Sequence, residues 1–413
     1  MQDGPSHTRA IRTDGAVLKV LDLGSMVGGP FAATLLGDLG AEVIKVEAPG
    51  HGDYVRWVSS GEGYTLLWQV HGRNKRSVTL NLKSAAGQNL LRRLAQWADV
   101  LIENNRPGVL DRLGLGYAQL SEVNPRLVYL SVSGYGQTGP YRERPSYEWA
   151  GAAFGGLTAV TGFIDRPPVM PGIAITDHTS AMFGVIGVLE AIRRRDLAGA
   201  EGRGALVDVA LYEPVIRMSN AYIASAFSGP VQAREGSFPS RQAEPHSKLG
   251  YVYETSDGRF IANFMATRPQ FERCVDAIGR PELKDDPRFA TELLRMEENY
   301  YVLDEALRTW VKSRTFEAAM AGLVAADQPV APVNGASEIL EDPHIASRGN
   351  MVELKNVRGE TVAIPGVLPH ISTDDGAIRF PAEELGASNA PVYQGLLGLS
   401  EAEMKRLADE GVI

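Results

Sequence analysis

The chain has 413 residues, of which 44% are hydrophobic and 22% are charged; this balance is typical of a folded globular protein and excludes a disordered or fibrous chain. Its formal net charge is −9 with both signs interspersed, so we expect neither nucleic acid nor an anionic membrane as a partner. The single cysteine, Cys274, excludes an intrachain disulfide and a cysteine-based zinc site. The polar N-terminus and the lack of a bilayer-length apolar run predict a cytoplasmic protein.

Strand and helix patterns alternate along the first half of the chain. Val17–Asp22 and Glu42–Glu47 are typical of buried strands, and between them Pro30 stands at the expected first position of a helix that runs to about Leu39. The next elements are a strand over Ser77–Leu82, a helix over Ser84–Trp97, a strand over Val100–Ile102 and a strand over Leu127–Val132. This alternation predicts an α/β fold in which helices cover both faces of a parallel sheet.

The pattern changes after about Arg217. Residues 228–250 are polar and rich in Gly, Pro and Ser, which predicts a linker or long loop. The later predicted elements are a hairpin over Tyr251–Phe264 that turns at Ser256–Gly258, helices over Pro269–Ile278, Met296–Lys312 and Phe316–Ala325, a strand over Val362–Pro365 and a last helix over Ser400–Glu410. We therefore divide the chain into a large α/β domain at 1–224, a smaller α+β domain at 225–335 and a C-terminal segment at 336–413.

The turn Gly24–Pro30 lies where a dinucleotide-binding fold would place its phosphate loop. Its spacing is not G-x-G-x-x-G, and Pro30 stands just before the helix, so a tight strand-to-helix turn is favoured over a nicotinamide site. Glu47 closes the second strand, as a ribose-binding acid would, but this alone is a weak signal.

Three polar segments each have a structural and a functional interpretation. The basic cluster Arg73–Arg76 is either a solvated face or a set of partners for the phosphates of an anionic cofactor. Glu103–Gly108 leaves the end of a strand, at the edge where open α/β sheets bind ligands, although Asn and Gly are also ordinary turn residues. Arg112 is either a surface helix residue or a phosphate partner. The residues alone leave these alternatives open.

Asp177 lies in Pro171–Ser180, directly before an apolar helix that we expect to start near Ala181. One interpretation is a helix N-cap or first-turn acid. In the other, the positive helix end keeps the carboxylate ionised at the edge of the sheet, where it attacks a thioester and forms a mixed anhydride. His178 is adjacent, but one His beside one Asp is not a triad. The chain has no G-x-S-x-G elbow and no H-E-x-x-H motif, so no catalytic metal is expected.

Several segments in a fixed order resemble the class III coenzyme A transferases, the family of formyl-CoA and crotonobetainyl-CoA:carnitine transferases. The matching segments are LDLGSMVGGPFA, LGAEVIKVEAPGHGD, NKRSVTLNLKS, ENNRPGVLDRLGLGY, SGYGQTGPY, PSYEWAGAAFGGLTAVTG and PGIAITDHTSAMFG. The resemblance runs from about Val17 to Ala191 and continues more weakly to about Leu399. Together these segments are far more specific than any single motif.

The resemblance implies that Asp177 takes the acyl group from a donor thioester such as succinyl-CoA. The released thiolate then forms an aspartyl-CoA thioester, which an acceptor carboxylate resolves. Tyr147 and Glu148 are implied to lie beside this nucleophile. The implied contacts with coenzyme A are Val27, Gly28, Leu80, Asn104, Asn105, Arg112 and Arg76. Coenzyme A thioesters are then substrates, and neither a permanently bound cofactor nor a metal is expected.

The family's fold implies one large Rossmann-like α/β domain built from both chain ends, so that 336–413 returns to it, and a small domain. It also implies an interlocked homodimer, although some transferases of the family are heteromers. The chain departs from the formyl-CoA enzyme at Val27, where that enzyme has a glutamine, and at Ser240–Lys248, which lacks its run of glycines. Formate and oxalate are therefore disfavoured as substrates.

Two alternatives to transferase activity remain. The first is a 2-methylacyl-CoA racemase, a branch of the family that uses a His with the aspartate; here that His position is Tyr147, whose phenol is a poor base at neutral pH. The second is a non-catalytic subunit of a heteromeric transferase, against which Asp177 argues. We further hypothesise that one or two cations bind a second carboxylate of the acceptor acid. The candidate cations are Arg144, Arg241, His246, Lys248 and Arg268.

Overall fold

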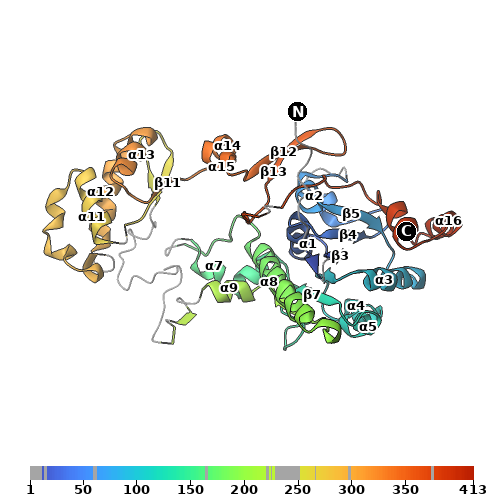
Figure 1. Cartoon of the computed structure of the whole chain (residues 1–413). Helices are drawn as coiled ribbons and strands as arrows, with labels where there is room; N and C mark the ends of the chain where they lie inside the picture. The colour runs from blue at the N-terminus through green and yellow to red at the C-terminus, as the bar shows by residue number, and fades with distance from the viewer. Residues whose placement is uncertain are drawn as a thin grey trace. The chain divides into compact units, whose positions relative to one another are not determined.

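Two compact units make up the protein (Figure 1). The structure, a computed structural model, describes residues 12–13, 16–58, 63–162, 166–219, 223–224, 226–227, 252–265, 267–295, 299–373 and 376–413. Unit 1 comprises Met1–Gly155, Pro171–Met218 and Pro343–Ile413, and unit 2 comprises Gly156–Met170 and Ser219–Asp342. Residues 343–413 of the C-terminal segment thus belong to the unit that begins the chain, and residues 336–342 belong to unit 2. Residues 156–170, which the sequence analysis assigned to the large domain, belong to unit 2.

A parallel sheet of six strands forms the centre of unit 1, which confirms the predicted parallel α/β architecture. In sheet order the strands are β5 (Lys75–Thr79), β4 (Glu42–Glu47), β3 (Lys19–Asp22), β6 (Val100–Glu103), β7 (Val128–Ser133) and β8 (Leu206–Ala210). The sequence analysis missed β8, because this edge strand is partly exposed and lacks the apolar run of a central strand. All carboxyl ends of the strands meet at one edge, where the turns after β3 and β6 emerge.

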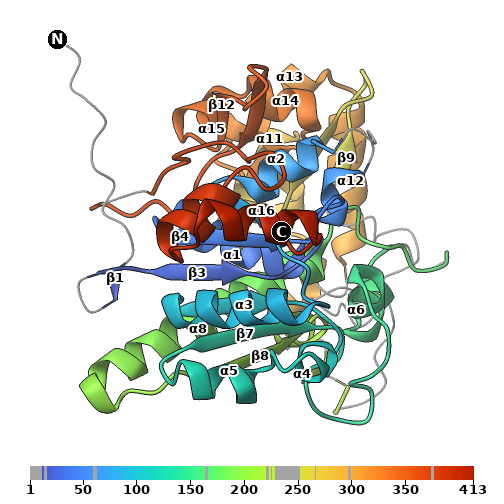
Figure 2. The same ribbon diagram turned by 90° about the vertical axis from the view of Figure 1, so that its right-hand side faces the viewer.

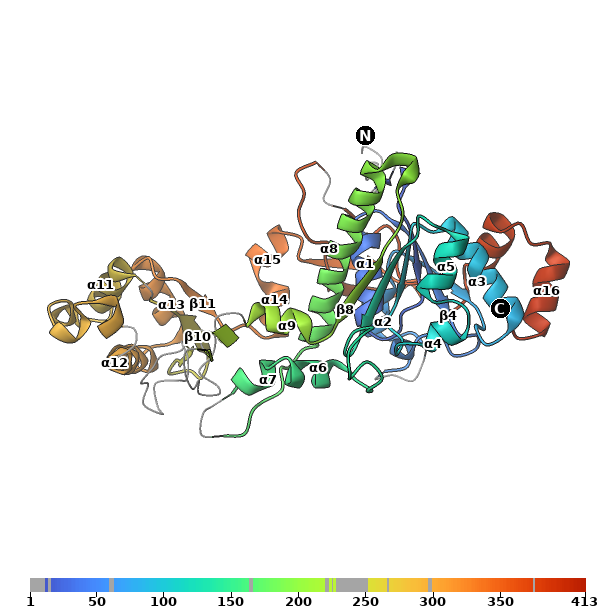
Figure 3. The same cartoon turned by 90° about the horizontal axis from the view of Figure 1, so that it is seen from below.

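Helices cover both faces of this sheet (Figures 2 and 3). One face packs against α1 (Gly28–Asp38) and α8 (Ile175–Leu197). The other face packs against α3 (Ala85–Trp97), α5 (Tyr117–Val123) and the C-terminal α16 (Glu401–Asp409). The C-terminal segment is joined to β5 by hydrogen bonds, because Tyr393 donates its hydroxyl to the Thr79 carbonyl at 2.7 Å.

Shorter elements complete unit 1. They are β1 (Arg12–Thr13), β2 (Ala16–Val17), α2 (Leu66–Gly72), α4 (Val109–Arg112), α6 (Glu148–Phe154), α9 (Glu213–Met218), α15 (Pro343–Ser347), β12 (Met351–Lys355), β13 (Thr361–Pro365), the 3-10 turns Tyr54–Arg56 and Gly199–Glu201 and the π-helical segment Ala390–Leu396. β12 and β13 form a separate antiparallel pair.

Unit 2 has its own core around a three-stranded antiparallel sheet in the order β11-β10-β9. The predicted hairpin corresponds to β9 and β10. The elements are α7 (Leu157–Val160), β9 (Val252–Glu254), β10 (Phe260–Asn263), α11 (Arg268–Ala277), α12 (Tyr300–Lys312), α13 (Phe316–Ala325), β11 (Val330–Pro332), α14 (Ala336–Glu341) and the 3-10 turns Pro281–Lys284 and Pro287–Phe289. In the described part of the chain, no helix is long and apolar enough to cross a membrane.

The basic cluster Arg73–Arg76 is neither a fully solvated face nor a patch at the ligand-binding edge. Arg73 is buried and forms an ion pair with Asp38 at 2.6 Å, at the end of α1. Lys75 is buried and forms an ion pair with Asp22 at 2.8 Å. Only Arg76 is exposed, at the amino half of β5, away from the carboxyl edge of the sheet. Two of the three cations therefore join β5 to the rest of unit 1.

We expect Arg73→Leu to lower the free energy of unfolding by about 3 kcal/mol, because it leaves the buried Asp38 carboxylate without its main counter-ion. Arg76→Leu, three residues further along the chain and exposed on β5, should change it by less than ~0.5 kcal/mol. Urea unfolding of the two variants checks this difference. Equal effects of both substitutions would contradict the structural role of Arg73.

Candidate active site

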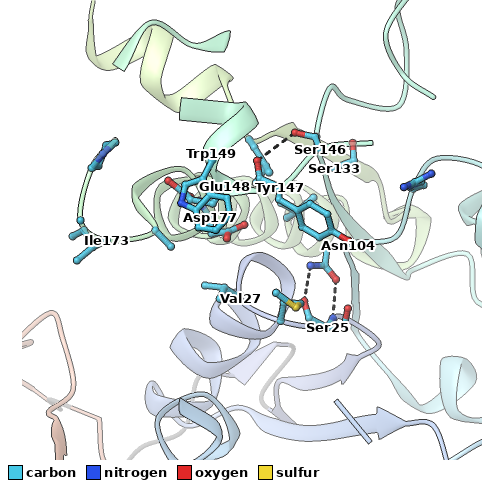
Figure 4. A pocket seen from close by; sticks show the side chains of 18 residues that line it. Ser25, Val27, Asn104, Ser133, Ser146, Tyr147, Glu148, Trp149, Ile173 and Asp177 are labelled. Carbon is cyan, nitrogen blue, oxygen red and sulfur yellow. Dashed lines mark hydrogen bonds between the residues drawn. The ribbon is translucent and has the colours of Figure 1, made fainter. Parts of the chain in front are cut away.

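A cavity of about 530 Å³ opens at the carboxyl edge of the unit 1 sheet. Its walls come from the turns after β3 and β6, the end of β7, the start of α6 and the segment before α8. The residues that line it include Ser25, Met26, Val27, Asn104, Arg106, Val132, Ser133, Ser146, Tyr147, Glu148, Trp149, Ile173 and Asp177. Figure 4 shows Glu148 and Asp177 on one side of this cavity and the turn with Ser25 and Val27 on the other. We call it the Asp177 cavity.

Asp177 is the third residue of α8, which begins at Ile175 and not near Ala181 as expected. The N-cap residue, Ala174, has no side chain that can accept a hydrogen bond. Glu148, from the start of α6, replaces it: its carboxylate accepts hydrogen bonds from the backbone N–H groups of Thr176 at 3.0 Å and Asp177 at 2.8 Å. The helix can therefore begin in a polar stretch, because a residue distant in sequence caps it.

The carboxylate of Asp177 itself makes no hydrogen bond or ion pair with any residue that the structure describes. A helix N-terminus normally favours an ionised carboxylate, but here the first amides of α8 are bound to Glu148. Burial in the cavity, together with the negative charge of Glu148, raises the pKa of Asp177 to about 7. Such a pKa matches a group that acts near neutral pH.

Gly28 allows the close approach of α1 to this carboxylate. A Cβ atom at Gly28 would lie 3.2 Å from Oδ1 of Asp177 and 3.4 Å from Cγ1 of Val132. Gly28 is the first residue of α1, and the N-cap of that helix, Val27, makes no side-chain capping bond. The glycine in the predicted turn thus permits close packing between α1 and α8.

Some neighbours of Asp177 line the cavity, and others are bound to residues outside it. Tyr147 and Trp149 line the cavity with 68% and 67% of their side chains exposed. His178 does not line the cavity; its Nδ1 lies 2.5 Å from the Ala174 carbonyl oxygen, and its ring packs against Phe31. The base adjacent to Asp177 in sequence is therefore engaged elsewhere.

Polar contacts from Asn104 and Asp53 hold the turn after β3. The sequence analysis singled out Asn104 but not Asp53. Met26 adopts the left-handed backbone region, with φ of 63°, which is costly for a residue with a side chain. The Asn104 side chain accepts from Ser25 N–H and donates to the Ser25 carbonyl, both at 2.8 Å. Asp53 accepts from Met26 N–H at 3.0 Å and pairs with buried Lys45 at 3.0 Å. The only sequence signal for Asp53 was its place in the matching segment LGAEVIKVEAPGHGD.

A second cavity, of about 570 Å³, lies beside the first, and Ser25 lines both. Of the seven expected coenzyme A contacts, Val27 and Asn104 line the Asp177 cavity, and Leu80 and Asn105 line the second. Gly28 lies beside Asp177, as described above. Arg112 and Arg76 line neither cavity, and both are exposed.

Of the cations proposed for a second carboxylate, Arg241, His246 and Lys248 lie outside the described residues. Arg144 stacks on the ring of Tyr141 at 3.6 Å. Arg268 belongs to unit 2, where it is bound to Glu272 and to two backbone carbonyls. The cation that lines the Asp177 cavity in the described part of the chain is Arg106, which the sequence analysis passed over although it follows a strand end in Asn-Asn-Arg-Pro.

The raised pKa of Asp177 predicts that the folded protein is more stable without this carboxylate. An unperturbed Asp has a pKa of about 3.9. Between about pH 4 and pH 7 the folded protein therefore binds more protons at Asp177 than the unfolded chain does, so the wild type loses folding stability as pH rises through this range. We expect Asp177→Asn to raise Tm by a few degrees at pH 8, with a gain that vanishes towards pH 4. Thermal unfolding across this pH range checks the prediction. The control is Glu305→Gln in α12, an exposed acid that should leave Tm unchanged; a pH-independent gain at Asp177 would contradict the account.

Comparison with known proteins accords with this geometry. The sequence model of CoA-transferase family III matches residues 16–389. The chain is 38% identical to the succinyl-CoA–L-malate CoA-transferase beta subunit of Chloroflexus aurantiacus, over 96% of this chain and 98% of the relative. It is 36% identical to the succinyl-CoA–D-citramalate CoA-transferase of the same organism, over 96% and 97%. The crystal structure of a CaiB/BaiF family protein from Brucella suis is similar with a TM-score of 0.77 at 31% identity, over 92% of this chain and 98% of that chain. The chain therefore belongs to CoA-transferase family III.

Proposed function

We propose that this CoA-transferase moves coenzyme A from succinyl-CoA to a dicarboxylic acid, with Asp177 as the nucleophile. The observation that carries the proposal is the Asp177 carboxylate, which faces a cavity at the carboxyl edge of the sheet with no bonded partner in the described residues. The donor is supported by the names of the two Chloroflexus relatives, both of which are succinyl-CoA-dependent. Their acceptors, malate and citramalate, support a dicarboxylic acid as the acceptor class.

In the first step an oxygen of Asp177 attacks the thioester carbonyl of the donor, the C–S bond breaks, and the thiolate of coenzyme A leaves. The products are a mixed aspartyl-acyl anhydride and the thiolate, which then attacks the aspartyl carbonyl and releases the donor carboxylate. The acceptor carboxylate attacks the resulting aspartyl-CoA thioester, which forms a second mixed anhydride and frees the thiolate again. The thiolate then attacks the acceptor's acyl carbonyl in this anhydride, so that the new thioester forms and the Asp177 carboxylate is released. The energy of the thioester is kept throughout, so the reaction needs no ATP.

The proposed roles of the neighbouring residues follow from their contacts. Glu148 holds the start of α8 and, by occupying its amides, leaves the Asp177 carboxylate weakly stabilised and reactive. Gly28 leaves room for that carboxylate to attack the thioester carbonyl of the donor. The second cavity, which meets the first at Ser25, is proposed to take the nucleotide part of coenzyme A, with Leu80 and Asn105 in its wall. Tyr147, exposed at the mouth, is proposed to cover the bound acyl group.

The racemase alternative is less well supported. Proton removal from an α-carbon requires a base, and no histidine is among the described residues that line the Asp177 cavity. We keep the non-catalytic alternative because two relatives are named as the beta and the alpha subunit of a succinyl-CoA–L-malate CoA-transferase. From the family resemblance we propose an interlocked homodimer, with a heteromer as the alternative assembly.

Mass spectrometry of the single purified chain after incubation with succinyl-CoA and trapping with hydroxylamine or borohydride tests the proposal. We expect a modification on Asp177 that is lost in Asp177→Asn and kept in the control Glu305→Gln. Because attack requires the ionised carboxylate, its rate of formation should rise with pH and level off above about 7.

An adduct on another residue would contradict the assignment of the nucleophile. If no adduct forms and solvent deuterium enters the α-carbon of a 2-methylacyl-CoA without an acceptor acid, the protein is a racemase. If an adduct forms only after a second, related subunit is added and lies on that subunit, this chain is the non-catalytic partner.

A further inference from the structure

The charged side chains that line the Asp177 cavity in the described residues are two carboxylates and one guanidinium. Glu148 and Asp177 supply the negative charge, and Arg106 supplies the positive charge. A dicarboxylic acyl group carries a distal carboxylate into this space, where the two carboxylates repel it more strongly than they would in water. The cavity therefore accepts such a group favourably only if the distal carboxylate meets Arg106.

The backbone of Arg106 is fixed on both sides. The Glu103 carboxylate accepts hydrogen bonds from the Asn105 backbone N–H at 2.7 Å and from its side-chain amide at 3.1 Å. On the other side, the Arg106 carbonyl accepts from Val109 N–H at 3.1 Å. Pro107 restricts Arg106 to extended backbone conformations. The base of this side chain is thus preorganised beside the cavity.

The guanidinium of Arg106, in contrast, is uncommitted. It is exposed, and it makes no hydrogen bond or ion pair with any residue that the structure describes. Lys45, the buried cation nearest the turn after β3, is already paired with Asp53. A guanidinium binds a carboxylate through two parallel hydrogen bonds, and its planar fork loses less conformational freedom per hydrogen bond than an ammonium group does.

We propose that Arg106 binds the distal carboxylate of the acyl group and so selects dicarboxylic over monocarboxylic substrates. The inference rests on the proposed function, in which Asp177 attacks the thioester carbonyl at the other end of the acyl chain. Donor and acceptor acyl groups occupy the same cavity in turn, so the same contact selects both. Arg106 is a specificity-determining residue and takes no part in bond making.

Binding measurements in the Asp177→Asn background test this without turnover. The probes are succinyl-CoA and butyryl-CoA, which have the same chain length and differ in the distal carboxylate. Calorimetry should show that Arg106→Met weakens succinyl-CoA binding about 10- to 100-fold and changes butyryl-CoA binding by less than ~3-fold. Arg106→Lys should keep part of the preference, because it keeps the charge but not the paired hydrogen bonds. The control Arg142→Met, an exposed arginine that lines none of the cavities described here, should keep the wild-type preference.

An equal loss of affinity for both thioesters would overturn the proposal, since Arg106 would then bind the coenzyme A portion or support the fold. Unchanged affinity for both would also overturn it. A selective loss for succinyl-CoA in this background, together with no adduct on Asp177 in the protein that keeps this aspartate, would support the role of Arg106 and reject the proposed transfer chemistry, so the two failures are distinguishable.

Discussion

The site depends on the hydrogen bonds that the first backbone N–H groups of α8 donate to the Glu148 carboxylate. This carboxylate lets the helix begin at Ile175, in a stretch with no capping side chain of its own, and so fixes where Asp177 stands. It also removes from Asp177 the stabilisation that a helix N-terminus offers an anion. One side chain thereby positions the proposed nucleophile and raises the free energy of its ionised form.

Buried charge supports the opposite wall of the cavity. Lys45 bridges Asp22, at the end of β3, and Asp53, which binds the backbone N–H of Met26. Burial alone would lower the pKa of Lys45, but the surrounding carboxylates outweigh it and raise the pKa to about 12, so this cation stays charged at any physiological pH. The left-handed conformation of Met26 is maintained by this network together with Asn104. Arg106 leaves the same sheet edge, so the two walls together hold the groups that we propose for the two ends of the acyl group.

The sequence allowed the sheet to be predicted because central parallel strands are apolar on both faces, and the family's motifs located Asp177 and Glu148. It did not allow the helix start to be predicted, because the cap of α8 comes from Glu148, far upstream in the chain. The basic cluster was misjudged for the same reason: the counter-ion of Arg73 is Asp38 on another element. Arg106 was passed over because a single arginine in a turn has no periodic signal, and only the fold brings it into the same cavity as Asp177.

Burial in the cavity and the negative charge of Glu148 together raise the pKa of Asp177 to about 7, and difference infrared spectroscopy measures this pKa directly. The spectrum of the wild type minus that of Asp177→Asn isolates one carboxyl group, which can be titrated in the full-length protein. We predict a midpoint of about 7 in the wild type and a lower midpoint in Glu148→Gln, where the neighbouring negative charge is gone. A wild-type midpoint near the ordinary value of about 4, or one that Glu148→Gln does not lower, would contradict the account.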